Sequence, residues 1–293
     1  MHLPVLLQES VEHLALKRGD TVLDATIGGG GHAIEVLKGI GPEGTLIAVD
    51  RDQEALERTK EYLKDYSDQI IYINENFRDI ENILSSAKQN CIDRAIFDLG
   101  VSSYQIDTAP RGFSFMNDGP LDMRLDTNQT LTAMEVVNKF GKDLLTDIIK
   151  KYGEERHAMR VAGEIVASRR KKRIETTGEL VEVIDRAVGK RYRNQKLHSA
   201  CRTFQAIRIY VNDELGSIEE GVEKTISYLS QGGRVCVISF HSLEDRIIKN
   251  LFRERARKEE LRLVTKKPII PGYEETRSNP RARSAKLRVA EKL

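Results

Sequence analysis

The chain has 293 residues, 40% of them hydrophobic and 31% charged, and a formal net charge of +2. It can bury a full α/β core, either as one domain with a large insertion or as two domains. No apolar run approaches the roughly 20 residues that a membrane span needs, so we expect a cytoplasmic protein with no membrane partner.

Cysteine and histidine usage indicates no metal site. The three cysteines, Cys91, Cys201 and Cys236, are far apart and form no C-x-x-C pattern, so neither a disulfide framework nor a zinc site is expected. The six histidines form no H-x-H or H-x-x-x-H pair. Each histidine alone is better explained as a structural residue than as a metal ligand.

A glycine-rich turn is the strongest local signal near the N-terminus. An apolar run at residues 22–26 predicts a strand that stops at four consecutive glycines, residues 28–31. A helix pattern follows directly in Ala33, Ile34 and Leu37. Glycine permits positive φ and a close approach of ligand to backbone, and the N–H groups of a helix start favour an electron-rich or anionic ligand. We therefore expect a nucleotide-like ligand at this turn.

An acidic residue follows at the position that such a ligand requires. Residues 45–50 predict the next strand, and Asp50 at its carboxyl end lies about 20 residues past the glycines. An acid at this distance hydrogen-bonds the ribose hydroxyls of a nucleotide. Because the glycine run also fits the G-x-G-x-x-A dinucleotide fingerprint, NAD stays open as the ligand at this point.

The following segments repeat the alternation of strand and helix. Residues 52–66 predict a helix, 70–77 a strand and its exit, 79–87 a helix, and 94–98 a fourth strand. Such repeats imply right-handed crossovers and a parallel sheet. The predicted fold class is doubly wound α/β.

The alternation of strand and helix stops after Asp98. Residues 99 to 128 have turn chemistry but no convincing period, and they contain the aromatic residues Tyr104, Phe113 and Phe115. An irregular stretch of about 30 residues at the carboxyl end of a strand is typical of a functional loop. Packing of these aromatics onto the core is an equally good explanation for each of them.

Residues 131 to 230 predict helices only, and they interrupt the sheet. The first expected helix begins near Thr132, and the second covers residues 154–170. The third starts at a capping box of Thr176 and Glu179, and the fourth covers residues 206–229. We therefore divide the chain into two parts. Residues 1–110 and 215–293 form a discontinuous α/β domain, and residues 111–214 form a loop plus helical insertion.

The sheet resumes near the C-terminus. Gly232 and Gly233 are expected to end the last helix of the insertion, and residues 234–241 predict a strand buried on both faces. A helix over residues 242–252 and edge strands within 261–270 and 285–290 follow.

Charge is distributed unevenly along the chain. Residues 1–130 contain 12 Lys/Arg and 22 Asp/Glu, whereas residues 131–293 contain 35 and 23. The densest basic run, Arg169-Arg-Lys-Lys-Arg173, predicts contact with a polyanion, and the alternative is a solvated helix face. The candidate RNA-binding residues are Arg170, Lys171, Lys172 and Arg173.

A class I methyltransferase explains these features better than a dehydrogenase does. In that arrangement S-adenosylmethionine crosses the carboxyl ends of the strands, Asp50 takes its ribose, Phe77 offers a face to adenine, and Asp98 lies near the methyl group. A dehydrogenase gives the basic insertion no role, and the chain has no obvious acid/base pair for hydride transfer.

Seven ordered motifs spread over the whole chain resemble the bacterial MraW/RsmH family. They are residues 24–32, 98–103, 111–124, 152–156, 202–208, 239–246 and 279–284. The resemblance implies a Rossmann-like class I fold and methyl transfer from S-adenosylmethionine to the N4 amine of a cytosine. The cytosine lies in the decoding region of small-subunit (16S) ribosomal RNA, which makes the 30S ribosomal subunit the expected partner.

The resemblance also implies a set of cofactor contacts. These residues are Gly30, Gly31, His32, Asp50, Phe77, Asp98 and Gln105. Residue types and their spacing predict cofactor contacts at the glycines, Asp50, Phe77 and Asp98. The contacts of His32 and Gln105 are predicted from the resemblance only.

The candidate catalytic residue is Asp98, which would accept a hydrogen bond from the cytosine amine and hold it in line with the methyl group. Methylation at C5 would need a cysteine nucleophile, and no cysteine lies in the loops expected to carry chemistry, so an amine is the favoured target. A flipped cytosine could stack on Tyr104, Phe113 or Phe115. An assembly factor that binds the cofactor without turnover is an alternative, and the sequence leaves the oligomeric state, a homodimer included, open.

Overall fold

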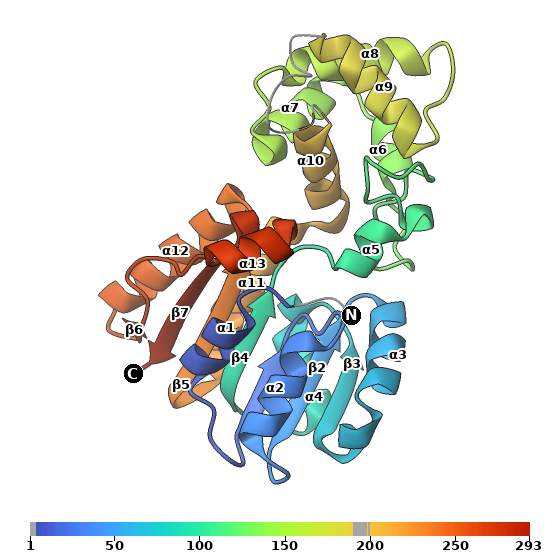
Figure 1. Cartoon of the computed structure of the whole chain (residues 1–293). Coiled ribbons are helices and arrows are strands. Elements are labelled where there is room, and N and C mark those ends of the chain that lie inside the picture. The colour runs from blue at the N-terminus through green and yellow to red at the C-terminus, as the bar shows by residue number, and fades with distance from the viewer. Residues whose placement is uncertain (1–3, 190–197, 199) are drawn as a thin grey trace. The chain divides into compact units, whose positions relative to one another are not determined.

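The computed structural model describes residues 4–189, 198 and 200–293. The chain divides into two compact units, Met1–Gly100 with Leu215–Leu293 and Val101–Glu214 (Figure 1). Their roles as a methyltransferase domain and an RNA-recognition domain remain predictions. Across the described residues, no helix is both long and apolar enough to cross a bilayer.

The first unit is built on a seven-stranded sheet with the order β3-β2-β1-β4-β5-β7-β6. Strands β1 to β5 are parallel, and β7 runs antiparallel between β5 and β6. The strands are β1 (Thr21–Asp24), β2 (Thr45–Asp50), β3 (Ile70–Asn74), β4 (Ile92–Asp98), β5 (Leu229–Ser239), β6 (Leu261–Leu263) and β7 (Lys286–Lys292). The predicted doubly wound α/β class is confirmed.

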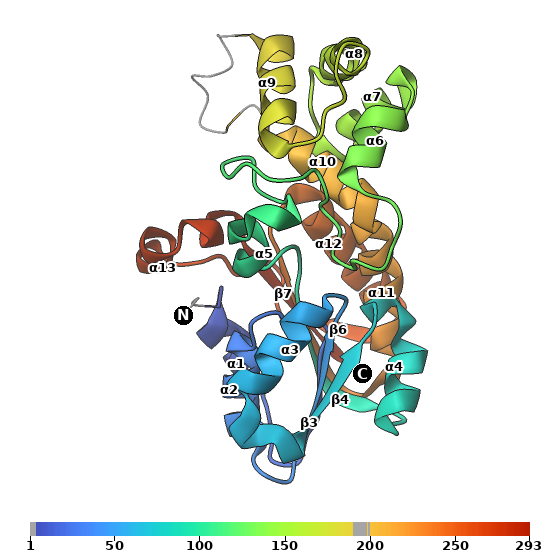
Figure 2. The same cartoon turned by 90° about the vertical axis from the view of Figure 1, so that its right-hand side faces the viewer.

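Helices cover both faces of this sheet, as Figure 2 shows for α1 to α3 on one side and α4 and α11 on the other. The helices are α1 (Leu7–Leu14), α2 (Gly31–Ile40), α3 (Gln53–Tyr62), α4 (Ile80–Ala87), α11 (Glu214–Tyr228), α12 (Ser242–Arg257) and α13 (Tyr273–Ser278). Successive residues of β2 alternate between the two cores: Leu46 and Ala48 pack with α1 to α3, and Ile47 and Val49 pack with α4, α11 and α12. Both faces of the central strands are therefore buried.

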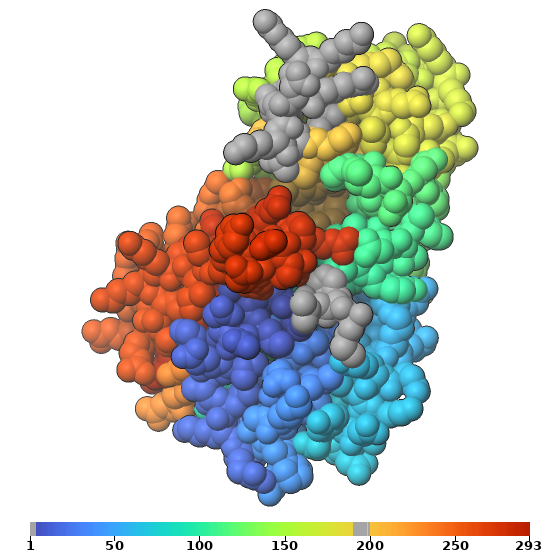
Figure 3. All heavy atoms as spheres, in the orientation of Figure 1, coloured from blue at the N-terminus to red at the C-terminus, as the bar shows by residue number. Residues whose placement is uncertain are grey.

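The C-terminal part of the first unit also touches its N-terminal segment. The backbone N–H of Leu6 donates to Oε1 of Glu275 in α13 at 2.7 Å, and the red atoms of α13 border the blue N-terminal residues in Figure 3. This bond holds Leu6, the residue directly before α1.

Three predictions about the return to the sheet are wrong. The strand expected at the edge over residues 285–290 is β7, which lies between β5 and β6. Gly232 and Gly233 do not end a helix, because α11 ends at Tyr228 and the glycines lie inside β5. Gly232 has φ +74°, and the pairing of β4 with β5 shifts in register at this end of the strands, so the glycines form an irregularity in the strand. The helix expected over residues 206–229 is two helices, α10 (Cys201–Asn212) and α11, which are separated at Asp213 with φ +46°.

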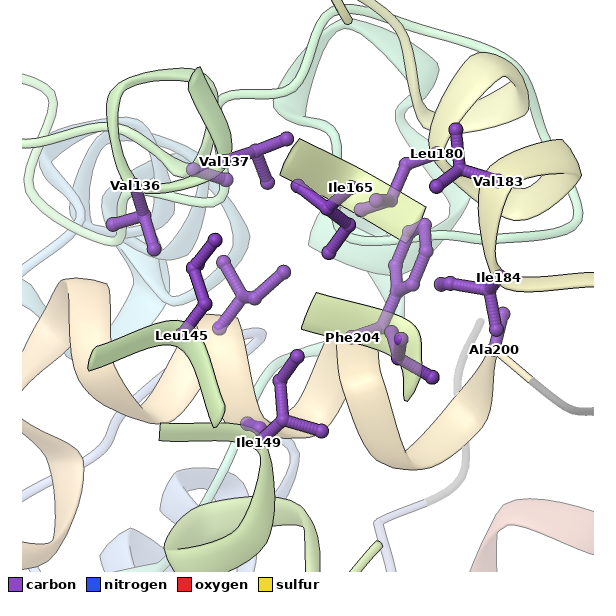
Figure 4. Packing of buried hydrophobic residues seen from close by; sticks show 14 of the residues in the cluster. Val136, Val137, Leu145, Ile149, Ile165, Leu180, Val183, Ile184, Ala200 and Phe204 are labelled. Atoms are coloured by element: carbon purple, nitrogen blue, oxygen red, sulfur yellow. The ribbon is translucent and has the colours of Figure 1, made fainter. Parts of the chain in front are cut away.

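The second unit is a helical bundle with its own core. Its helices are α5 (Ser103–Asp107), α6 (Ala133–Lys139), α7 (Lys142–Gly153), α8 (Ala158–Arg169), α9 (Thr177–Val188) and α10. Figure 4 shows side chains such as Val136, Leu145, Ile165, Ile184 and Phe204 pointing toward one another from these helices.

The stretch expected to be irregular contains two short helical turns, α5 and the 3-10 turn Ala109–Arg111. Phe113 belongs to the core of the second unit, and Phe115 packs against Phe204 with ring centroids 5.8 Å apart. Tyr104 is exposed. The packing explanation therefore holds for Phe113 and Phe115, while stacking of a base on Tyr104 remains a prediction.

Candidate active site

Three carboxylates lie at the carboxyl edge of the sheet in the first unit. Asp50 ends β2, Asp24 ends β1 and Asp98 ends β4. Because Asp24 pairs with Ala48 and Ile96, Asp50 and Asp98 each lie two residues beyond it along neighbouring strands. The glycine-rich loop leaves β1 between them, so acids surround this loop.

Hydrogen bonds clamp the loop to its neighbours. The N–H of Gly28 donates to Oδ2 of Asp50 at 3.0 Å, and the hydroxyl of Thr59 donates to the carbonyl of Gly28 at 2.7 Å. Gly28 and Gly30 have φ of +49° and +74°, which L side chains rarely adopt. The glycines thus permit a sharp turn that Asp50 and Thr59 hold in place.

The four glycines have different roles. A Cβ on Gly31 would lie 2.4 Å from Cγ of Pro4, and one on Gly30 would lie 3.0 Å from Cγ2 of Thr59. A Cβ on Gly29 would have no atom within 4 Å from any residue that the structure describes. Gly31 therefore allows the N-terminal segment to pack closely, and Gly29, which was not among the predicted residues, leaves the loop open to a ligand.

Asp50 keeps acceptor capacity although the loop uses it. Its Oδ1 accepts the N–H of Asp52 at 2.9 Å, and its Oδ2 accepts the N–H of Gly28. A carboxylate offers about four lone-pair sites, so each oxygen can accept one further hydrogen bond. Burial raises the pKa of Asp50 to about 6, while these N–H donors lower it, so the carboxylate is charged at neutral pH.

Asp98 has the most strongly perturbed carboxyl group of the three. Its backbone N–H donates to Oγ1 of Thr26 at 2.6 Å, and its Oδ1 is buried without a hydrogen bond in the described part of the chain. Burial raises the pKa of Asp98 to about 8, and the charges of Asp24 and Glu244 add to the effect. A buried acceptor without a donor is costly, so a ligand donor or cation would stabilise it.

His32 faces Asp98 as a neutral imidazole. Its Nε2 lies 3.2 Å from the carbonyl of Val5, which can only accept, so Nε2 carries the proton. Burial lowers the pKa of His32 to about 4, and Nδ1 therefore presents a lone pair 3.8 Å from Oδ2 of Asp98. His32 does not neutralise the charge of Asp98.

Sequence reasoning missed Asp24 and Glu244 as parts of this site. Burial raises the pKa of Asp24 to about 7, with the N–H of Thr26 opposing and the charge of Asp50 adding to the rise. Glu244 is fully buried and accepts the N–H groups of Phe240 and His241 at 2.8 and 3.1 Å. An acid that ends an apolar strand is the signal that could have identified Asp24.

Phe77 lies mainly in the hydrophobic core. Its ring meets that of Phe97 edge-on at 5.4 Å, and a Cβ on Gly221 would approach Phe77 to 2.5 Å. Only 9% of the residue is exposed, which leaves a small surface for an adenine. Its predicted role in cofactor binding remains a prediction.

The remaining predicted residues belong to the second unit. Gln105 is buried in the capping box of α5, where its Oε1 accepts the N–H of Ser102 at 2.9 Å. The four basic candidates follow α8 and are all exposed: Arg170, Lys171, Lys172 and Arg173. Lys172 forms an ion pair with Glu179, and Nε of Arg173 lies 4.0 Å from Glu175.

The first residue of the basic run has a structural role. The guanidinium of Arg169 donates to the carbonyls of Val137 and Phe140, both at 2.6 Å. It therefore joins α8 to the end of α6, and only the four residues after it present their charges to solvent.

The site suits a ligand that carries positive charge and hydroxyl groups. When burial and mutual repulsion raise the pKa values of carboxyl groups, a nearby cation stabilises their charged forms most strongly. The sheet order, the glycine loop after β1 and the acids at the ends of β2 and β4 define a class I methyltransferase.

The chain belongs to the MraW methylase family, whose model matches residues 1–293. It is 47% identical to ribosomal RNA small subunit methyltransferase H of Halothermothrix orenii, over 100% of this chain and 98% of the relative. It is 49% identical to the protein of that name from Persephonella marina, over 100% and 99%. The family expected from the seven motifs is confirmed, which excludes the dehydrogenase alternative.

A solved structure supports the fold. A crystal structure of a candidate rRNA-methylase from Clostridium thermocellum aligns with a TM-score of 0.50 and 11% identity, covering 100% of this chain and 98% of that one. At this identity the likeness concerns the fold alone.

Proposed function

We propose that this protein transfers a methyl group from S-adenosylmethionine to the N4 amine of a cytosine in the decoding region of small-subunit ribosomal RNA. Family membership and the names of the relatives support the reaction class and the substrate. The observation that carries the proposal is the group of Asp24, Asp50 and Asp98 around an open glycine loop.

The charge of the site favours this cofactor over a dinucleotide. S-adenosylmethionine carries a sulfonium and an ammonium group and supplies an electrophilic methyl when bound. The orphaned Oδ1 of Asp98 and the raised pKa values of Asp24 and Asp98 fit a cationic ligand. The pyrophosphate of NAD would instead bring further negative charge to acids whose pKa values are already raised.

Asp50 and the loop would position the nucleoside part. The second lone pair on each oxygen of Asp50 suits the two hydroxyls of a ribose. Gly29 would lie against the ligand, because no atom of the described residues lies within 4 Å of a Cβ built on it. These contacts fix the ligand along the carboxyl edge of β1 and β2.

Asp98 would act on the amine. The lone pair of a cytosine N4 is delocalised into the ring, so the nitrogen must be held in line and must lose a proton as it gains the methyl group. An ionised Asp98 carboxylate accepts a hydrogen bond from the amine, orients it, and then takes the proton. Thr26 holds the backbone of Asp98 in place for this role.

The RNA would be held through its phosphates. The exposed Arg170, Lys171, Lys172 and Arg173 of the second unit supply the charge for such contacts. A ribosomal substrate also implies that the protein works in the cytoplasm.

The test is transfer of labelled methyl from S-adenosylmethionine to small ribosomal subunits that lack the modification, followed by nucleoside analysis. We expect N4-methylcytidine as the product. Cofactor binding without any methylated nucleoside would favour the alternative of an assembly factor, and methylation at another atom would contradict the proposed role of Asp98.

A further inference from the structure

A stripe of basic residues runs along α12 in the first unit. Arg246, Lys249, Arg253 and Arg257 follow one another at intervals of three, four and four residues, so they lie on one side of the helix. The buried residues Ile248 and Phe252 lie on a neighbouring face of the helix and pack it against the sheet. The stripe is therefore presented outward.

Most charges of this stripe are not neutralised by acids. Lys249, Arg253 and Arg257 form no ion pair with any described residue. Other cations of the same helix are paired, because Arg255 bonds to Glu223 and Glu260. Pairing is thus available on α12, and Lys249, Arg253 and Arg257 lack it among the residues that the structure describes.

The stripe borders a shallow depression between α12 and the strands β6 and β7. Lys249 and Arg253 line it together with Lys266 and Arg288, and Phe252 and Leu263 form its apolar wall. Apolar walls of low dielectric concentrate the field of the surrounding charges. The depression therefore attracts anions.

The acid that contacts the lining residue Arg288 is already shared between two cations. Asp245 accepts the guanidinium of Arg288 at 2.7 Å and the ammonium of Lys286 at 3.0 Å. A single carboxylate between two cations leaves the surroundings positive. Lys249, Arg253 and Lys266 remain as the accessible charges.

The length of the stripe points to a polyanion. The eleven residue steps from Arg246 to Arg257 span about 17 Å at 1.5 Å per residue, which is the length of several nucleotides of one strand. A single phosphate would need one such group. The stripe also starts where β5 ends, at the sheet edge that bears Asp98.

We propose that this surface, the α12 track, binds the phosphate backbone of the substrate RNA on the methyltransferase unit itself. The inference rests on the proposed function for the identity of the RNA. The α12 track is a second RNA site besides the basic segment of the second unit, and it is formed by Lys249, Arg253, Arg257 and Lys266. Phosphate contacts at the α12 track hold the strand that leads to or from the target base.

The experiment compares three variants of the full chain. The first carries Lys249→Gln, Arg253→Gln and Lys266→Gln. The matched control carries Lys17→Gln, Lys60→Gln and Lys88→Gln, three exposed lysines of the same unit, and has the same change in net charge. The third carries Lys249→Arg, Arg253→Lys and Lys266→Arg, which keeps the charge.

Binding to small ribosomal subunits and to purified ribosomal RNA is measured between 50 and 200 mM salt, roughly the range in which phosphate contacts are lost. We expect the first variant to make the slope of log K against log salt shallower by about 2, at about 0.7 per contact. The control and the charge-keeping variant retain the native slope. All three keep the native melting temperature and affinity for S-adenosylmethionine.

If the first variant has the same slope of log K against log salt as the control, the proposal that the α12 track binds RNA is overturned. If the native protein fails to bind or methylate small subunits, the proposed function fails, and the slopes with purified ribosomal RNA still decide the inference. A slope that changes equally in the first variant and the control indicates general attraction of charge, and it also overturns the track.

Discussion

The backbone N–H of Asp98 donates to Oγ1 of Thr26 at 2.6 Å, which joins the end of β4 to the loop after β1. The same loop continues into the glycines that Asp50 holds through Gly28. The proposed catalytic carboxylate and the proposed cofactor loop are thus parts of one hydrogen-bonded arrangement. A change in the loop should therefore affect catalysis as well as binding.

Thr26→Val tests this connection. Valine preserves the shape of threonine but leaves the N–H of Asp98 without its acceptor, which costs about 1–3 kcal/mol of stability. We expect turnover to fall more than cofactor affinity does, because Asp98 is no longer held in line. Thr26→Ser keeps the hydroxyl and should retain turnover. Equal turnover in the Val and Ser variants would show that this bond does not position Asp98.

Asp98→Asn should lower methyl transfer by about 100-fold or more, the usual effect of removing a general base. Native single-turnover rates should rise with pH as Asp98 loses its proton. Its pKa in the cofactor complex lies below the value of about 8 in the ligand-free protein, because the cofactor is cationic. The variant should show no such rise. Near-native turnover in the Asn variant at saturating cofactor and RNA would exclude a catalytic role.

The same carboxylates should make the ligand-free protein less stable at alkaline pH. Asp24 and Asp98 have pKa values of about 7 and about 8 in the folded chain, and about 3.9 is usual for an unfolded chain. At pH values between the unfolded and the folded pKa, the native state thus binds more protons than the unfolded chain. The free energy of unfolding therefore falls as pH rises through the folded pKa values.

Asp98→Asn should therefore be more stable than the native protein at pH 8, by about 2 kcal/mol because water reaches part of the side chain. The difference should shrink at pH 5. Urea unfolding without ligand measures both values, and Asp68→Asn, at an exposed site, serves as the control. A variant that is destabilised equally at both pH values would contradict the assignment of a buried, repelled charge.

Local patterns were sufficient to predict most of the sheet and the acids at its edge. The strand at residues 45–50 is found with those bounds, because a short continuous apolar run and a terminal Asp50 are properties of the segment itself. Asp98 was likewise predicted at the end of a strand. Prediction was possible where each residue's role depends on its own neighbours in the chain.

The rest depends on partners that are distant in sequence. The glycines of β5 resemble a helix end, and only pairing with β4 keeps them inside a strand. Asp24 gains its raised pKa from burial and from Asp50, which lies on the next strand. Glu244 acts on Asp98 from a helix about 150 residues further along the chain. No periodicity in the sequence reports such contacts.

Gly29 and Gly31 should respond differently to alanine. Gly31→Ala places a Cβ 2.4 Å from Cγ of Pro4 and should cost about 1–3 kcal/mol of stability. The Cβ of Gly29→Ala has no atom of the described chain within 4 Å, so the substitution should change stability by less than about 0.5 kcal/mol. Because its methyl group would occupy the ligand's side of the loop, we expect a loss of about tenfold or more in affinity for S-adenosylmethionine. Calorimetry measures both quantities, and native affinity in Gly29→Ala would mean that the ligand does not approach this face.

The basic segment of the second unit should contribute to the salt dependence of RNA binding in proportion to its unpaired charges. Arg170 and Lys171 form no ion pair with a described residue, whereas Lys172 and Arg173 lie beside Glu179 and Glu175. Replacing these four residues by Gln should therefore make the slope of log K against log salt shallower by about 1 to 2, less than four full contacts would give.

Arg169→Gln provides the contrast for this measurement. Its guanidinium bonds to the carbonyls of Val137 and Phe140, so its loss should lower the melting temperature and leave the salt slope unchanged. The slope is measured with small ribosomal subunits between 50 and 200 mM salt, roughly the range in which phosphate contacts weaken. An unchanged slope in the fourfold variant, at native stability, would mean that this segment is a solvated helix end. The RNA would then be held by other surfaces of the protein.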